Sequence, residues 1–259
     1  MNLKRYIVYW LKNNSLTLQS LLADRLSSIL FIFGKLLRFS FYLGFLFALK
    51  LKIKLVTGYN IDQLVVFFLI YNLFDLVGQL FYLGVYWYRA DILSGAFDFT
   101  LLKPINPLFQ VLTSHTDFLD LPQLIIVLAC LVIFLPGVSA AEALVFVILS
   151  FVSMLLLTAV HIFVAAIGVI TTEVDHTIWI FRGLSGMAQV PVDVYSRAVR
   201  DFLTFVVPVG IIFTFPAKSL FGLLSVPIIT LALFFAFTFY LLSLKFWQYA
   251  LKKYSSASS

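Results

Sequence analysis

The sequence predicts an all-α integral membrane protein with six transmembrane helices, an interfacial elbow helix before the first span, and short re-entrant helices on the outer side between spans five and six. Apolar residues make up 62% of the 259 residues and charged residues only 12%, against roughly 45–50% and about 25% in soluble domains. Uncharged runs of about 20 residues, the length that crosses a bilayer, recur along the chain. We therefore expect residues 1–259 to form a single transmembrane domain.

The first expected element is an amphipathic helix over about residues 3–14, lying on the membrane surface. Its apolar residues recur at helical spacing, as in an interfacial helix: Leu3, Tyr6, Ile7, Trp10 and Leu11. Its basic residues lie on the opposite face: Lys4, Arg5 and Lys12. The polar residues at 12–14 break this pattern and are expected to end the helix.

The first two spans, at about residues 27–49 and 61–88, both carry charge at membrane depth. Lys35 and Arg38 share one face of the first span. They either extend toward the headgroups, as long basic side chains do, or face the helix bundle and a substrate path. Asp75 interrupts the second span, and a carboxylate in lipid is so costly that we expect it to face protein or water.

The remaining spans are expected at about residues 117–136, 142–172, 174–190 and 220–246. Arg182 lies inside the fifth of these, and we group it with Lys35, Arg38 and Asp75 as candidate substrate-path residues. The segment at about 191–217 is broken by prolines and charges. Irregular backbone at membrane depth persists only where protein or water covers it, so we expect re-entrant half-helices there.

Orientation follows weakly from the basic residues, which are somewhat more numerous on the side that carries both termini. We therefore expect a multi-pass protein of the cell (plasma or inner) membrane with cytoplasmic termini.

The segment between the second and third spans carries the most informative motif. Residues 89–112 contain a glycine, an acidic and apolar stretch, and then Leu101-Leu102-Lys103-Pro104-Ile105-Asn106-Pro107. This segment resembles the cytoplasmic loop of the type-two ABC transporter permease family, in a bacterial subgroup with a Gly followed by Leu-Leu-Lys-Pro-x-Asn-Pro. The stretches at 190–196, 205–209 and 215–222 resemble the same subgroup and occur in the same order.

The resemblance implies the membrane subunit of an ATP-driven exporter, which dimerises with a second copy or with a sister permease. ABC ATPase subunits would bind ATP and Mg and act on a cytoplasmic coupling loop; this chain itself would hold no cofactor. The coupling residues implied are Arg89, Asp91, Gly95, Phe97, Asp98, Leu102, Lys103, Pro104, Asn106 and Pro107. The outer re-entrant gate implied comprises Pro191, Asp193, Tyr195, Pro208 and Pro216.

Two polar clusters suggest metal binding, because imidazoles and carboxylates are metal ligands: His115, Asp117 and Asp120, and Glu173, Asp175 and His176. Each cluster lies at an expected membrane boundary, so we interpret both as solvated helix ends and caps. No P-loop and no nucleophile elbow occurs in the sequence. We expect no catalytic site, no metal site and no nucleic-acid partner; the basic residues flank apolar runs and face membrane lipids instead.

Two other functions remain open. An ion-coupled secondary transporter would use the four charged residues within spans to bind ions, although the two halves of the chain show no internal repeat. A non-transporting membrane scaffold would have no ATPase partner. The abundance of Phe and Tyr favours an amphiphilic substrate for the exporter.

Overall fold

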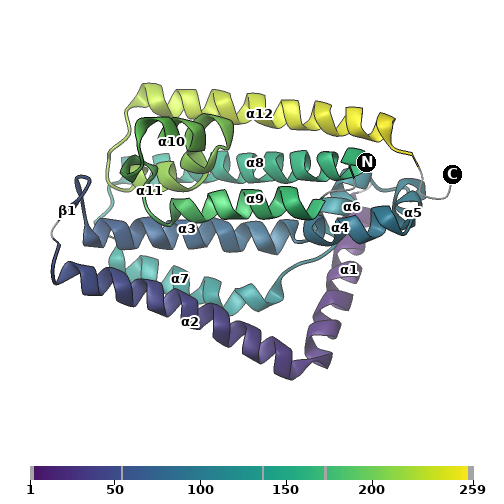
Figure 1. Cartoon of the computed structure of the whole chain (residues 1–259), viewed down its shortest axis with the longest axis horizontal. Coiled ribbons are helices and arrows are strands. Elements are labelled where there is room, and N and C mark those ends of the chain that lie inside the picture. The colour runs from purple at the N-terminus through teal and green to yellow at the C-terminus, as the bar shows by residue number, and fades with distance from the viewer. Residues whose placement is uncertain (1–2, 54, 136, 172–173, 256–259) are drawn as a thin grey trace.

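A bundle of long helices forms the body of the protein, and the computed structural model describes residues 3–53, 55–135, 137–171 and 174–255 (Figure 1). The helices of the bundle are α2 (Arg25–Lys50), α3 (Ile61–Tyr82), α7 (Leu121–Phe134), α8 (Ala140–Thr171), α9 (Val174–Gly186) and α12 (Val226–Lys253). Both chain ends lie at one end of the bundle with α4 (Gly84–Leu93), α5 (Ala96–Leu102) and α6 (Pro107–Thr113). A short hairpin and the outer segment lie at the other end.

Four described helices are long and apolar enough to cross a membrane: Arg25–Lys50, Ile61–Leu93, Ala140–Thr171 and Val226–Lys253. Two bent pairs meet the same test together. Pro107–Thr113 joins Phe118–Phe134 at 44°, and Arg197–Val206 joins Gly210–Ser219 at 87°. The chain is therefore an all-α membrane protein with four to six crossings.

The segment expected as the fifth span is shorter than a full crossing. α9 has 13 residues and the 3₁₀ turn η2 (Met187–Gln189) adds three. At 1.5–2 Å per residue this segment rises about 26 Å, less than the ~30 Å hydrocarbon core. The pair of short helices that bends by 87° follows it.

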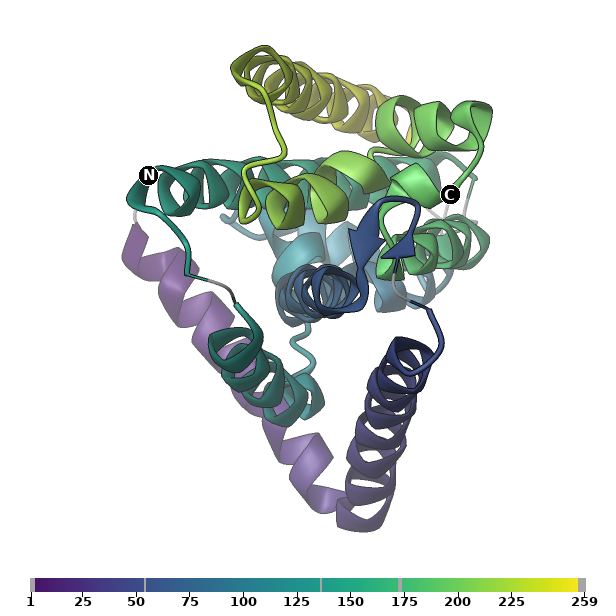
Figure 2. The ribbon, with the colours of Figure 1, turned by 90° about the vertical axis from the view of Figure 1, so that its left-hand side faces the viewer.

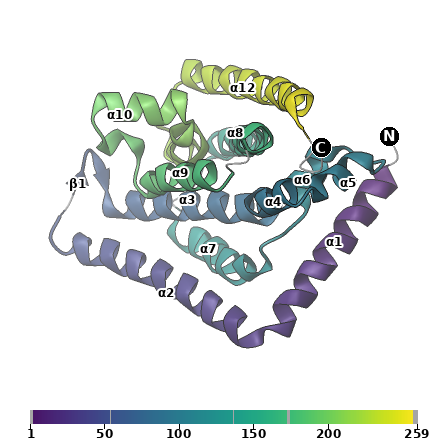
Figure 3. The ribbon, with the colours of Figure 1, turned by 45° about the vertical axis from the view of Figure 1, so that its right-hand side comes forward.

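The N-terminal helix α1 (Leu3–Ala23) runs well past residue 14, where the sequence analysis expected it to end. Its two central asparagines keep the helix intact by bonding backbone oxygens. Asn14 Nδ2 donates to Trp10 O at 2.9 Å, and Asn13 Nδ2 donates to Ser114 O at 3.2 Å. The helix ends where Asp24 caps α2 by accepting from Ser27 N. Figure 3 shows α1 connecting the end of the bundle that holds α5 and α6 to the start of α2.

A two-residue turn joins the first two spans. Strands β1 (Leu55–Val56) and β2 (Tyr59–Asn60) pair in antiparallel fashion around Thr57 and Gly58. Both turn residues have positive φ, 48° and 88°, the geometry of a type I′ hairpin. Asn60, directly after the turn, starts α3 through a capping box with Gln63.

The 3₁₀ turn η1 (Phe118–Asp120) precedes α7. The outer segment, at about residues 191–219, consists of short helical turns: η3 (Val192–Val194), α10 (Arg197–Asp201), the π-helical η4 (Phe202–Val206) and η5 (Gly210–Thr214), and α11 (Phe215–Ser219). Pro208 lies in the 87° bend. The last helix begins at Val226, six residues after the expected start at 220, because Gly222 takes a left-handed φ of 63° before it. Its end, Lys253, also lies beyond the expected 246.

Candidate functional site

A cavity of about 960 Å³ lies among α2, α3, α4, α9 and the segment that leads into α7. All four residues expected at a substrate path, Lys35, Arg38, Asp75 and Arg182, line this one cavity. Amide side chains of Asn72, Gln79 and Gln123 and the aromatic rings of Tyr71, Tyr86 and Trp179 complete a wall that is both polar and apolar. Figure 2, seen from the outer end, shows α2 at the edge of the bundle, on the opposite side from α12.

Lys35 forms one side of the cavity through ion pairs with two carboxylates. Its Nζ lies 2.9 Å from Asp117 Oδ2 and also bonds Asp120 Oδ1. Asp120 is fully buried, and its Oδ2 has no hydrogen-bond partner among the described residues. The interpretation of Lys35 as a side chain reaching the headgroups is therefore wrong; it faces protein.

The same contacts correct the interpretation of Asp117 and Asp120 as a solvated helix end. Asp117 does cap a short turn by accepting from Leu119 N at 3.1 Å, but both aspartates also neutralise Lys35 inside the bundle. The signal that could have identified them was Lys35 itself, since a buried cation requires a counter-charge. Among described residues no group of three or more His, Cys, Asp or Glu side chains could hold a metal ion. Glu173 lies outside the described residues.

Arg182 and Asp75 meet on the opposite side of the cavity. Arg182 Nη2 lies 3.6 Å from Asp75 Oδ2, and Nη1 donates to the Tyr86 hydroxyl at 3.2 Å. Gln79 Nε2 donates to the same Asp75 oxygen at 3.0 Å. The carboxylate in the second span therefore faces protein and has a partner, as a charge at membrane depth requires.

Helix α9 connects this cavity to the segment expected to be a coupling loop. At its start, Asp175 Oδ2 lies 3.0 Å from Arg89 Nη1 of α4. About two turns further along, Arg182 reaches Asp75. One short helix thus contacts the coupling loop at its start and lines the cavity along its length.

The coupling loop (residues 89–112) is largely helical, consisting of the end of α4, all of α5 and most of α6. Gly95, with φ 74°, supplies the left-handed turn between α4 and α5. Phe97 is fully buried, with its ring 5.1 Å from Tyr88 and 5.0 Å from Tyr254. The Tyr254 hydroxyl donates to Asp98 Oδ1 at 2.9 Å, and burial together with this carboxylate raises the pKa of Tyr254 to about 12.

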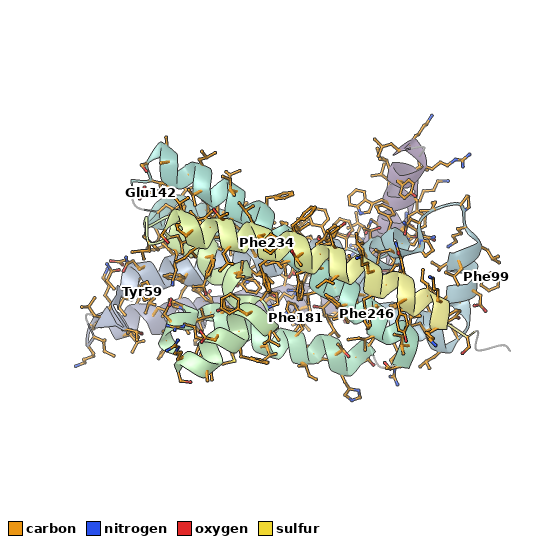
Figure 4. All side chains as sticks on the ribbon, turned by 90° about the horizontal axis from the view of Figure 1, so that it is seen from above. Tyr59, Phe99, Glu142, Phe181, Phe234 and Phe246 are labelled. Carbon is orange, nitrogen blue, oxygen red and sulfur yellow. The ribbon has the colours of Figure 1, made fainter. Side chains whose placement is uncertain are left out.

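The tip of the coupling loop is apolar and exposed. Phe99 and Leu102 are 69% and 80% exposed, and Lys103 and Pro104 beside them are also exposed. Asn106 caps α6 by accepting from Leu108 N at 2.8 Å, with Pro107 in the first turn. Figure 4 shows Phe99 at the far end of the molecule from Tyr59. The fold therefore presents a rigid apolar tip at the end where both termini lie.

Of the other coupling residues, Asp91 is exposed at the end of α4. Asn106 also contacts α1, because its backbone N donates to the Tyr6 hydroxyl at 3.2 Å. The rings of Tyr6 and Tyr9 pack on Phe109. These contacts join α1 to the coupling loop, and no pattern in the sequence indicates them.

Among the expected outer gate residues, Asp193 makes the contacts that link the gate segment to its neighbours. Asp193 Oδ2 lies 2.7 Å from Lys218 Nζ and accepts from the Tyr59 hydroxyl at 3.0 Å. Burial and the nearby carboxylate raise the pKa of Tyr59, so its hydroxyl stays a donor. Tyr195 donates to Met187 O at 2.8 Å. Pro191 and Pro208 are buried at bends, and Pro216 lies in the first turn of α11. The gate segment is thereby tied to the hairpin between the first two spans.

Comparisons with known proteins give one match. A search of curated proteins and a search of solved structures each found no match. The family model described as ABC-2 family transporter protein matches residues 36–258. That range covers more than half of the chain and includes the coupling loop, the gate segment and most of the cavity lining, although Lys35 and the lining residues before it lie outside it. The chain therefore belongs to the ABC-2 transporter family, as a multi-pass membrane permease subunit of an ABC transporter.

Proposed function

We propose that this chain is the membrane subunit of an ATP-driven exporter, in which separate ATPase subunits act on the coupling loop and the substrate leaves through the cavity. Two copies, or this chain and a sister permease, would form the transporter in the plasma or inner membrane with the termini in the cytoplasm. ATP and Mg would be bound by the ATPase. The chain contributes binding, gating and force transmission, without catalytic residues of its own.

The observation that carries this proposal is the path through α9. A push on the coupling loop reaches α9 through Arg89 and Asp175, and α9 carries Arg182 into the cavity wall. An apolar tip of Phe99, Leu102 and Pro104 gives an ATPase a surface to hold, since exposed apolar clusters at the end of a rigid element mark protein contacts. Lys103 adds a charge for orientation.

The gate would close the outer end of the same path. Asp193 joins Tyr59 and Lys218, so the re-entrant segment is fastened to the first two spans when the cavity faces inward. Outward release then requires these contacts to separate. The short turns and bends of this segment suit such movement because few of its backbone bonds continue from one turn to the next.

The test is affinity purification of the tagged chain from its native membrane in mild detergent. We expect a soluble ATPase to be recovered with it, and recovery to fall at least tenfold for Leu102→Asp. Leu55→Asp, at the opposite end and 63% exposed, is the matched control and should leave recovery unchanged. Recovery of the chain without an ATPase under these conditions would contradict the proposal.

The ion-coupled secondary transporter remains the second candidate, and the Lys35–Asp117–Asp120 cluster favours it, because buried titratable groups also carry ions across membranes. Purified chain reconstituted in vesicles without an ATPase distinguishes the two. Substrate movement driven by a proton or sodium gradient alone would favour the secondary transporter.

A further inference from the structure

The charges that line the cavity are not balanced locally. One part of the cavity has an excess of negative charge and another part has an excess of positive charge. On one side a single cation, Lys35, faces two carboxylates, Asp117 and Asp120. Asp120 Oδ2 is buried without a partner among the described residues. Asp117 is the part of this cluster that a ligand can reach, with 12% of its side chain exposed. This side of the cavity therefore has one more carboxylate than cations, and a cationic hydrogen-bond donor at Asp117 would balance it.

The excess of positive charge lies at Arg38, one helical turn after Lys35 on α2. Arg38 is exposed to the cavity, and among the residues that the structure describes none forms an ion pair with it. Arg182 and Asp75 neutralise one another, and Asp175 is held by Arg89. Arg38 is thus the position at which the cavity offers a guanidinium to an acidic group. Guanidinium groups bind carboxylate and phosphate in bidentate geometry.

An apolar groove leads out of the cavity at this same position. It is a shallow, widely open groove on the surface of one helix, lined by Gly34, Leu37, Arg38, Phe41, Tyr42 and Phe45 of α2. Gly34, Arg38 and Tyr42 line both the groove and the cavity. A ligand anchored at Arg38 can therefore place a hydrocarbon chain along α2 while its polar end stays inside.

We propose that the cavity binds a zwitterionic amphiphile: an acidic group at Arg38, an ammonium group with N–H donors at Asp117, beside the buried carboxylate of Asp120, and an apolar chain in the groove. This inference rests on the proposed function in taking the cavity as the substrate site, and it adds the chemical class of the substrate. A purely anionic amphiphile would leave the carboxylates without a donor. A purely cationic one would leave Arg38 without a partner.

Ligands of matched chain length test the class on the unmodified protein. The full chain is purified in an uncharged maltoside, and binding is followed by tryptophan fluorescence, because Trp87 and Trp179 line the cavity. The probes are lysophosphatidylethanolamine, lysophosphatidylcholine and lysophosphatidylglycerol. We expect the ethanolamine form to bind at least tenfold more tightly than the anionic glycerol form. It should also exceed the choline form, whose quaternary ammonium has no N–H to donate. Equal binding of the three would overturn the proposal.

Two substitutions assign the two ends of the ligand. Arg38→Gln should weaken the ethanolamine and glycerol forms alike, by removing the partner of their shared phosphate. Asp117→Asn, which keeps the capping oxygen, should weaken only the ethanolamine form and so abolish the preference. Arg25→Gln on the same helix and Asp62→Asn on α3 lie outside the cavity and are the matched controls. An unchanged preference in Asp117→Asn would contradict the assignment.

A fourth probe separates the two sources of this chemistry, a lipid headgroup and an acylated peptide. Nα-lauroyl-lysine carries a carboxylate and a primary ammonium on one chain. Tighter binding of this probe than of lysophosphatidylethanolamine indicates a peptide-like substrate, and the reverse indicates a lipid. Weak binding of both, no better than the anionic probe, rejects the zwitterion class.

The outcome is independent of the ATPase. Equal affinity for all the probes, together with recovery of an ATPase in the purification, would reject the substrate class and leave the exporter proposal standing. Tighter binding of the zwitterionic probes with no ATPase recovered would support the substrate class and contradict the exporter proposal.

Discussion

Arg89 Nη1 lies 3.0 Å from Asp175 Oδ2, and this ion pair joins the coupling loop to α9. The two side chains are 39% and 42% exposed, so after solvent screening the pair contributes at most about 1 kcal/mol to folding. Its importance would lie in transmitting movement rather than in stability. Coupling and stability can therefore be tested separately at this pair.

The first prediction concerns that transmission. In a Cys130→Ala background, a cysteine replacing exposed Gly183 of α9 reports on the cavity wall. In membranes that contain the partner ATPase, we expect ATP to change its maleimide labelling rate, and Arg89→Asp to abolish the change. Arg89→Asp with Asp175→Arg should restore part of it, because the reversed pair can still form.

The control for this experiment is the Lys50–Asp62 pair at the outer end, which is comparably exposed. Reversing it should leave the nucleotide response intact. A response that survives Arg89→Asp would show that force reaches α9 by another contact.

The second prediction concerns the gate. Val209 is fully buried in the outer segment, so a cysteine there should react slowly with an impermeant maleimide. Asp193→Asn removes the charge that holds Lys218 and weakens the bond from Tyr59, and we expect labelling to accelerate about tenfold or more. Asp201→Asn, in the same segment but with only exposed partners, should not change the rate. Equal rates in the two variants would mean that Asp193 does not hold the gate closed.

The third prediction concerns the buried charges. Lys35→Met leaves Asp117 and Asp120 without their cation, and removing one partner of a buried pair costs on the order of 3–5 kcal/mol. We expect a large drop in the thermal unfolding midpoint in detergent. Lys35→Met with Asp120→Asn should recover much of the loss, because one of the stranded charges is removed. Arg38→Met, with no ion pair to break among the described residues, should change the midpoint little; a loss as large as that of Lys35→Met would refute the assignment.

The fourth prediction compares two glycines. Gly95 has φ 74°, where a Cβ costs about 1–2 kcal/mol, so Gly95→Ala should destabilise the turn between α4 and α5. Gly44 lies within α2 with no atom near its missing Cβ. Gly44→Ala should stabilise the chain by up to about 1 kcal/mol. Unfolding midpoints of the two variants check the opposite signs.

The sequence was informative within the membrane spans, where a charged side chain is costly to bury. Lys35, Arg38, Asp75 and Arg182 stood out because charges in apolar runs need partners, and the structure brings all four to one cavity. It was uninformative at the ends of apolar runs, where charges are expected anyway. Asp117 and Asp120 therefore looked solvated, since no local pattern shows that the start of α7 lies against α2.

The other differences also have local physical causes. The coupling loop looked irregular because Pro104 and Pro107 interrupt it, yet Pro107 occupies the first turn of a helix, where proline is favoured. The polar residues at 12–14 looked like a break, but Asn14 bonds the oxygen of Trp10 within the helix. The bond from Asn13 to Ser114 O, about 100 residues away, is a long-range contact that no local pattern in the sequence indicates.

Helix α2 has only two buried residues, Phe39 and Leu46, although it forms one wall of the cavity. A wall held by so few side chains can move aside while the rest of the bundle stays assembled. If the proposed amphiphile leaves through this wall, its polar part alone would have to fit the cavity. A molecule much longer than the cavity could then be moved with its apolar chain outside the cavity.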